Sequence, residues 1–243
     1  MIEIPSLRPE SRYGMPTADL MLFNRQYIVG YSYLFRQPRW AMQVIDENTK
    51  QMKDDFDRLD NFREDMRIPE KFRATLDDYK NSGFDRGHLI NSADRKGSKI
   101  INSETFLLSN MSPQKPDFNR DIWLELEKAV RILADKDEYA EVYTICGPLF
   151  AIGDPIEVIG ENGVVVPDAY FKSILAEKTK AKSTNQLAMW SFVIPNSKAD
   201  KPLQEFLVPT DEVERWGGLQ LWDRLRGEKS DRLKTKKGRM WAV

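Results

Sequence analysis

Several residue types and patterns are scarce in this chain of 243 residues, and each scarcity narrows what it can be. The single cysteine, Cys146, excludes an intrachain disulfide and a cysteine-rich zinc site, and we expect it to be a small buried residue in a reducing compartment. No stretch approaches the roughly 18 apolar residues of a membrane span. Residues 1–5 also lack the basic and then apolar segments of an export signal. These absences predict a cytoplasmic protein that does not bind membranes.

The charge balance gives no strong excess of either sign. The chain has 37 Lys and Arg against 38 Asp and Glu, a net charge of −1, so a polyanion partner would need a local basic patch. Its length and its 41% hydrophobic residues suit one large globular domain. Gly-x-Ser-x-Gly, Gly-x-Gly-x-x-Gly and Gly-Lys are all missing, which disfavours a serine hydrolase and a nucleotide-binding enzyme.

Histidine is as scarce as cysteine, and the only one, His88, lies in the apparent loop Phe84-Asp85-Arg86-Gly87-His88-Leu89. Histidine alone titrates near neutral pH. Gly87 would let the backbone take a positive φ or approach a ligand closely, Arg86 could hold a phosphate, and Asp85 could orient either neighbour. Because a lone histidine is more often a structural residue than a base, the decision between these two roles depends on the neighbouring motifs.

The hydrophobic pattern predicts strands and two long helices. Residues 1–19 look like an irregular arm, and strands at 20–35 and 39–45 look like a hairpin that turns at 36–38, with Trp40, Met42 and Val44 on one face and Gln43 between them. Further strands are expected at 105–108 and, extending a central sheet, at 140–147, 163–166, 170–175 and 189–194. We expect a polar loop at 89–103, a turn at 110–114, and helices at 116–134 and 210–226. The basic tail is expected to be solvated, and the alternative is that it makes auxiliary contacts with phosphate.

The helix at 116–134 carries two side-chain rows. Ile122, Leu126, Ala129 and Leu133 recur at core spacing. Asn119, Trp123, Glu127 and Arg131 follow one another at intervals of four, so they lie along one side of the helix beside that core row. The simpler interpretation of the second row is a solvated surface with a Glu127–Arg131 ion pair, which the i,i+4 spacing favours.

An acidic segment offers a second candidate metal site. Asp54, Asp55, Asp57 and Asp60 could form a calcium cluster, but the glycine of the calcium-loop pattern is absent. A solvated, partly helical surface is the favoured interpretation.

Three motifs together resemble a known family. Asp85–His88, Leu108–Gln114 and Phe118–Trp123 with Leu126-Glu127 are similar in order and spacing to the DNA/RNA non-specific endonucleases of the ββα-metal superfamily. The resemblance covers most of residues 20–195. It implies an α+β fold, with a central, mainly antiparallel sheet flanked by helices. It also implies a single nuclease domain over 1–226, including the arm at 1–19, followed by a basic tail at 227–243.

The resemblance also implies roles for individual residues. His88 matches the general base, and Asn119 matches the direct ligand of Mg²⁺, for which Mn²⁺ is the alternative. Glu127 matches a carboxylate that binds the waters of the metal, and Asn110 matches a residue that positions the site. The phosphate-facing arginines would be Arg58, Arg86 and Arg131. Ile90-Asn91 departs from the commoner Ala-Pro pair and affects only the local loop.

This chemistry suits a phosphodiester, whose anionic oxygens demand a positive electrophile and an activated water. Contacts confined to phosphate and metal predict weak sequence preference, DNA and RNA as substrates, and 5′-phosphate ends. The alternative is a catalytically silent nucleic-acid-binding or interaction module with the same fold. An active non-specific nuclease endangers the cell that makes it, so we expect an inhibitor or regulatory protein as a partner, and the relatives suggest a homodimer.

Overall fold

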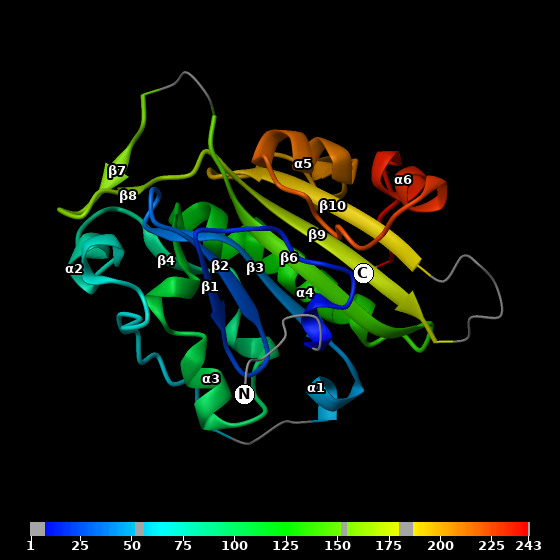
Figure 1. The fold of residues 1–243 in the computed structure, drawn as a ribbon, viewed down its shortest axis with the longest axis horizontal. Helices are drawn as coiled ribbons and strands as arrows, with labels where there is room; N and C mark the ends of the chain where they lie inside the picture. Colours follow the sequence, from blue (N-terminus) through cyan, green and yellow to red (C-terminus); the bar gives the residue numbers. More distant parts are fainter. Residues whose placement is uncertain (1–7, 52–55, 152–154, 180–186, 243) are drawn as a thin grey trace.

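A large antiparallel sheet dominates the computed structural model, which describes residues 8–51, 56–151, 155–179 and 187–242 (Figure 1). Within these residues the sheet has seven strands in the order β1-β2-β3-β6-β9-β10-β11. The strands are β1 (Leu20–Phe23), β2 (Ile28–Ser32), β3 (Gln37–Ile45), β6 (Tyr139–Leu149), β9 (Ala169–Lys178), β10 (Leu187–Pro195) and β11 (Leu207–Val208). The sheet agrees with the predicted fold class. None of the helices in these residues is long and apolar enough to cross a membrane.

The N-terminal part of the sheet differs from the predicted hairpin. Residues 20–35 form two strands, and the turn before β3 lies at 33–36, where Arg36 has a φ of 55°. The turn predicted at 36–38 was therefore misplaced, because Pro38 lies inside β3. A proline is tolerated there since it stands next to the start of the strand, beside a register shift opposite Gly30 and Tyr31.

Both faces of the sheet are covered, which explains why its central strands are mostly buried. Trp40, Met42 and Val44 pack on one face with Val213 of α5 (Thr210–Gly217), as their alternation predicts. The opposite face packs against α4 (Trp123–Ala134), which contributes the buried residues Leu126, Ala129 and Leu133. Gln43 faces this second layer and is 3% exposed, so it needs buried polar partners.

Three regions outside the sheet differ from their predicted structure. The short strands β4 (Asp85–His88) and β5 (Met111–Gln114) form a separate two-stranded antiparallel sheet, where a loop and a turn were expected. The strand predicted at 105–108 is wrong, since only Leu107 makes a single bridge, to Arg63. β8 (Val164–Val165) pairs with β7 (Val158–Ile159) and does not extend the central sheet.

Short helices complete the connections. The expected polar loop at 89–103 contains a 3₁₀ turn at Ser92–Asp94 and the beginning of α3 (Lys99–Glu104). The remaining short helices are α1 (Glu47–Gln51) and α2 (Leu76–Tyr79). In the acidic segment, Asp54 and Asp55 lie outside the described residues, while Asp60 pairs with Arg58 at 2.8 Å.

The C-terminal region is structured. α5 ends at Gly217 and is capped by Gly218, whose φ of 57° is a left-handed helix end, so the helix predicted to 226 was too long. α6 (Glu228–Thr235) follows, and residues 236–242, here the C-terminal strap, run across α4 and β10. Trp241 of the strap donates from its indole to the backbone oxygen of Ala129 at 2.9 Å. The described tail is thus packed on the domain, where solvated chain was expected.

Candidate active site

The two-stranded β4–β5 sheet positions the segment around His88. Gly87 pairs with Ser112, and a Cβ atom at Gly87 would lie 2.0 Å from Oε1 of Gln114. Gly87 does not have a positive φ. The glycine is therefore required by close contact with the fully buried Gln114 side chain, which is the second of the two explanations that the sequence offered.

Asp85 joins this small sheet to the helical turn that carries Asn119. Its carboxylate accepts from Nδ2 of Asn119 at 2.9 Å, and from Nε and Nη2 of Arg120 at 2.9 and 2.7 Å. Although burial acts in the opposite direction, these hydrogen bonds keep the pKa of Asp85 below its ordinary value. Asn119 lies in a π-helical turn, Phe118–Ile122, directly before α4, and such turns are frequent at functional sites.

His88 packs against a pair of phenylalanines that also contact each other. Its ring is 5.6 Å from that of Phe62 and 5.1 Å from that of Phe106, and its backbone oxygen accepts from the indole of Trp123 at 3.4 Å. Nε2 is buried and has no hydrogen-bond partner among the described residues. Burial, together with the positive charges of Arg58 and Arg86, lowers the pKa of His88 from 6.5 to about 3. The imidazole is thus neutral far below the pH at which free histidine titrates.

Two exposed arginines stack on the same phenylalanines. The guanidinium of Arg86 lies 4.1 Å from the ring centre of Phe62, and that of Arg58 lies 5.3 Å from the ring centre of Phe106. Stacking on an aromatic face restrains the planar guanidinium while its edge can still bind an anion, and the edge of Arg58 already pairs with Asp60 through Nε at 2.8 Å. Arg58 therefore lies on the ring next to His88, close enough for its charge to act on the imidazole.

Asn110 is buried and hydrogen-bonds to the backbone that follows His88. Its Oδ1 accepts from the backbone nitrogen of Ile90 at 3.0 Å, and its Nδ2 donates to the backbone oxygens of Ile90 and Thr105 at 2.8 and 2.9 Å. Because the amide is fully used, Asn110 can position the site but cannot bind substrate.

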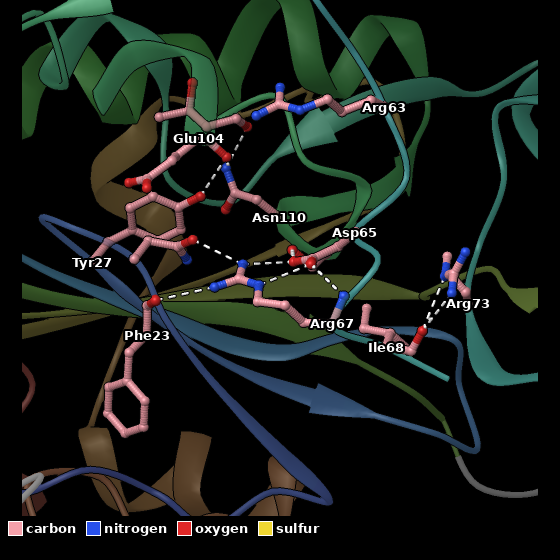
Figure 2. A network of polar contacts seen from close by, with 12 residues as sticks. Phe23, Tyr27, Arg63, Asp65, Arg67, Ile68, Arg73, Glu104 and Asn110 are labelled. Atoms are coloured by element: carbon pink, nitrogen blue, oxygen red, sulfur yellow. Dashed lines mark hydrogen bonds and ion pairs between the residues drawn. The ribbon is translucent and has the colours of Figure 1, made fainter. Parts of the chain in front are cut away.

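A polar network supports the turn that carries Asn110 (Figure 2). The buried Asp65 accepts from Ser109 at 2.6 Å and from Arg67 at 2.6 and 2.8 Å, and Arg67 also donates to the backbone oxygen of Phe23. Tyr27 donates to the backbone oxygen of Glu104 at 2.6 Å. The backbone around His88 is thereby tied to β1 and to the turn before β2.

Glu127 is buried at 8% exposure in the first half of α4. Burial raises the pKa of Glu127 to about 7, although the positive charges of Lys172 and Arg131 act in the opposite direction. Lys172, on β9, is 3% exposed, and its ammonium lies 4.4 Å from the ring centre of Trp123. This buried lysine was not predicted, because in the sequence it is only one polar residue inside a strand.

Arg131 does not form the expected ion pair with Glu127. Its Nη1 binds Oδ1 of Asp94 at 2.9 Å, and no ion pair joins it to Glu127 in the described part of the chain. Asp94 was missed as a site residue because nothing in the sequence of the 89–103 segment distinguishes it.

The donor set suits a hard divalent cation. Oδ1 of Asn119 accepts no hydrogen bond from the described residues, since Asp85 binds only Nδ2. Among the described residues no three His, Cys, Asp or Glu side chains gather closely enough to hold a metal ion. A cation bound by Asn119 would therefore keep most of its waters, as Mg²⁺ does in proteins.

A hollow of about 720 Å³ lies elsewhere, lined by Arg39, Lys115 and Trp216 among others. None of the predicted site residues lines it.

Comparisons with known proteins find related nucleases. A family model described as DNA/RNA non-specific endonuclease matches residues 9–228. Mitochondrial endonuclease G of Homo sapiens is 36% identical over 220 residues, which cover 86% of this chain and 71% of that protein. The mitochondrial nuclease of Saccharomyces cerevisiae is 37% identical over 237 residues, covering 91% and 71%, and nuclease C1 of Cunninghamella echinulata is 34% identical over 231 residues, covering 88% and 87%.

A solved structure titled "Crystal structure of the EndoG/EndoGI complex: Mechanism of EndoG inhibition" has the same fold. It superposes with a TM-score of 0.81 at 33% identity and covers 93% of this chain and 95% of its own. The α+β fold of a ββα-metal nuclease is therefore confirmed. From the family match and these relatives we conclude that the chain belongs to the DNA/RNA non-specific endonuclease family and is a nuclease.

Proposed function

We propose that this nuclease cuts DNA and RNA without sequence preference, using Mg²⁺ at Asn119 and His88 as the general base, and leaves 5′-phosphate ends. The observation that supports these roles best is the hydrogen bond between Asn119 and Asp85, which holds the amide oxygen away from Asp85, beside the strand that carries His88. Mn²⁺ is the alternative metal.

His88 would take the proton of the attacking water. The ring is neutral at neutral pH, so that a lone pair is available, and the negative charge of a bound phosphate would raise the pKa of the ring and make it a stronger base. Because Nε2 is buried without a partner, Nδ1 is the nitrogen that we assign to the water. The edge-on contacts with Phe62 and Phe106 limit the rotation of the ring.

The remaining residues would bind the phosphate and the metal. A divalent cation would supply a positive electrophile for the phosphoryl oxygen and for the departing 3′-oxygen. Glu127 would accept hydrogen bonds from waters of the cation, and Arg58, Arg86 and Arg131 would face phosphate oxygens. None of these groups needs a base edge, which supports the absence of sequence preference.

We also propose the organisation around this site. Residues up to 226 would form one nuclease domain, with the C-terminal strap packed on it. A homodimer is expected as before, and the structure of the EndoG/EndoGI complex supports an inhibitor protein as a partner. The protein would be located in the cytoplasm, as the sequence predicts, or in the mitochondrion, as the names of several relatives favour. Cell fractionation distinguishes these two locations.

A nicking assay tests this function against the silent-module alternative. Supercoiled plasmid and an RNA oligonucleotide are incubated with wild type, His88→Ala and Asn119→Ala in Mg²⁺, in Mn²⁺ and in EDTA. Cleavage of both substrates by wild type only with a metal, and a loss of about 10²–10⁴-fold in His88→Ala, are expected. DNA binding by His88→Ala should persist. Near-native cleavage by either folded variant would remove that residue from the mechanism, and ligation of the products tests for the 5′-phosphate.

A further inference from the structure

Two carboxylates compete for Arg131. Glu127 precedes it by four residues on α4, an arrangement that favours an ion pair on an isolated helix. In the folded protein Arg131 binds Asp94 instead, with Nη1 at 2.9 Å from Oδ1. The tertiary structure has therefore replaced the local pair with a contact to the turn at Ser92–Asp94.

Asp94 can win this competition because its carboxylate is already fixed from other elements. Oδ2 of Asp94 accepts from Nε2 of Gln43 on β3 at 3.0 Å, and from Nδ2 of Asn91 at 2.9 Å. Oδ1 remains for Arg131, and the side chain of Asp94 is only 4% exposed. A charged acceptor that is held in place and shielded from water attracts a guanidinium more strongly than a mobile one.

The orientation of Gln43 is itself fixed. Its Oε1 accepts from Nη2 of the fully buried Arg95 at 2.6 Å, so its amide nitrogen must be the group that faces Asp94. The chain of contacts from Arg95 through Gln43 and Asp94 to Arg131 thus joins β3 to α4. It leaves Asp94 little freedom to move toward another partner.

The contact with Asp94 uses only one end of the Arg131 fork. Nε and Nη2 of Arg131 have no hydrogen-bond partner in the described residues, and its side chain is 30% exposed. Since the guanidinium is planar and rigid, fixing Nη1 also fixes the direction of the remaining donors. Glu127, in turn, has no ion pair within the described chain.

We infer that Asp94 is a positioning residue, which holds Arg131 away from Glu127 and presents the free edge of its guanidinium to a substrate phosphate. This inference rests on the proposed phosphate-binding role of Arg131. The inference explains why an acidic residue lies beside a surface that must bind an anionic phosphate. Without Asp94, the carboxylates four residues away on either side, Glu127 and the C-cap residue Asp135, are the nearest along the chain, and an Arg131–Glu127 pair would occupy both groups.

A double-mutant cycle tests the inference. kcat and KM are measured on a short DNA duplex in Mg²⁺ for wild type, Asp94→Asn, Arg131→Met and the double variant. Each single change should lower kcat/KM by about 10- to 100-fold, the range for removing one hydrogen bond to a charged group. Because Asp94 acts through Arg131, the double variant should equal Arg131→Met. Additive losses, or wild-type activity of Asp94→Asn, would overturn the inference.

Arg131→Lys gives an independent test that keeps the charge. A lysine has one ammonium, which Asp94 would bind, so the variant should be as impaired as Arg131→Met. Full activity of Arg131→Lys would show that two donor ends are not needed, and would overturn the inference even if Asp94→Asn failed to fold. Full activity of Arg131→Met would show that Arg131 has no part in the proposed function. The other outcomes bear only on the role of Asp94.

A matched control separates positioning from general stability. Asp78 is another buried carboxylate, 2% exposed, which accepts from the backbone of Thr75 at 2.7 Å and from Asn162 at 3.0 Å. Asp78→Asn should lower the thermal stability as Asp94→Asn does, but leave kcat/KM and the slope of its logarithm against the logarithm of salt concentration unchanged. An equal loss of kcat/KM in both variants would make Asp94 a structural residue only.

Discussion

Asn119 and Asp85 are joined by a hydrogen bond of 2.9 Å from the amide nitrogen to the carboxylate, and it fixes which way the amide points. A side-chain amide can present either its oxygen or its nitrogen. Because the acceptor Asp85 occupies the nitrogen, the oxygen is left for a cation. Asp85, on the strand that also carries His88, therefore determines which atom of Asn119 is available to bind a metal ion.

Replacing Asp85 by Ala should weaken metal binding. The amide of Asn119 would lose its restraint, and the change of such an outer partner typically costs about 10- to 100-fold in metal affinity or activity. We expect the Mg²⁺ concentration for half-maximal nicking to rise by that factor. Arg120→Ala, which removes the other partner of Asp85 and spares Asn119, is the control and should shift it less. An unchanged Mg²⁺ dependence in Asp85→Ala would contradict this role.

Gly87 and Gln114 should behave as a matched pair. Gly87→Ala places a Cβ atom within 2.0 Å of the Gln114 side chain, which must displace β4 or β5. Nicking should fall by about tenfold or more, since a misplacement of about 1 Å can cost about 10²-fold. Adding Gln114→Ala makes room and should restore part of the activity. If the double variant is no more active than Gly87→Ala alone, the contact is not what requires the glycine.

His88 should make stability depend on pH. Its pKa is lowered from 6.5 to about 3 on folding, so below pH 6.5 the unfolded chain binds a proton that the folded one does not. This residue therefore costs stability increasingly as the pH falls from 6.5 toward 3. Urea unfolding of wild type and His88→Gln at pH 7.5 and pH 5 should show the variant gaining relative stability at pH 5. An equal difference at both pH values would mean that His88 titrates normally.

The periodic elements could be predicted from the sequence because their side chains repeat with the geometry of the element. The row Ile122, Leu126, Ala129 and Leu133 is buried as its spacing predicts, and the alternation of Trp40, Met42 and Val44 correctly assigns one sheet face. The order and spacing of the three motifs correctly predicted the family and, through it, the fold. No comparable regularity marks β4 and β5, which are four residues each and contain glycine, proline and charged side chains.

The contacts that depend on tertiary structure could not be predicted. The i,i+4 rule considers only one helix, so it pairs Arg131 with Glu127 and overlooks Asp94 on another segment. Composition likewise predicts a solvated tail, because lysine and arginine outnumber the apolar residues that anchor it. Trp241 was the signal available in the sequence, but its partners Trp190 and Ala129 come from β10 and α4.

The C-terminal strap should contribute to stability and not to phosphate binding. Trp241 lies 5.1 Å from the ring of Trp190 and 6.1 Å from that of Phe192, and its indole donates to Ala129 of α4. Trp241→Ala should lower the free energy of unfolding by about 2 kcal/mol, less than the roughly 3–5 kcal/mol for a fully buried tryptophan because Trp241 is partly exposed.

Lys236→Ala/Lys237→Ala, at exposed strap positions, is the companion variant, and it separates the packing of the strap from its charge. If the strap only braces α4 against β10, this variant should keep the stability of wild type and the same salt dependence of DNA binding. If the lysines bind phosphate, the slope of log affinity against log salt should become shallower by about one unit for each phosphate that the variant no longer binds. Urea unfolding of both variants, with binding to a DNA duplex at several salt concentrations, distinguishes the two. A shallower slope with unchanged stability in Trp241→Ala would refute the bracing role.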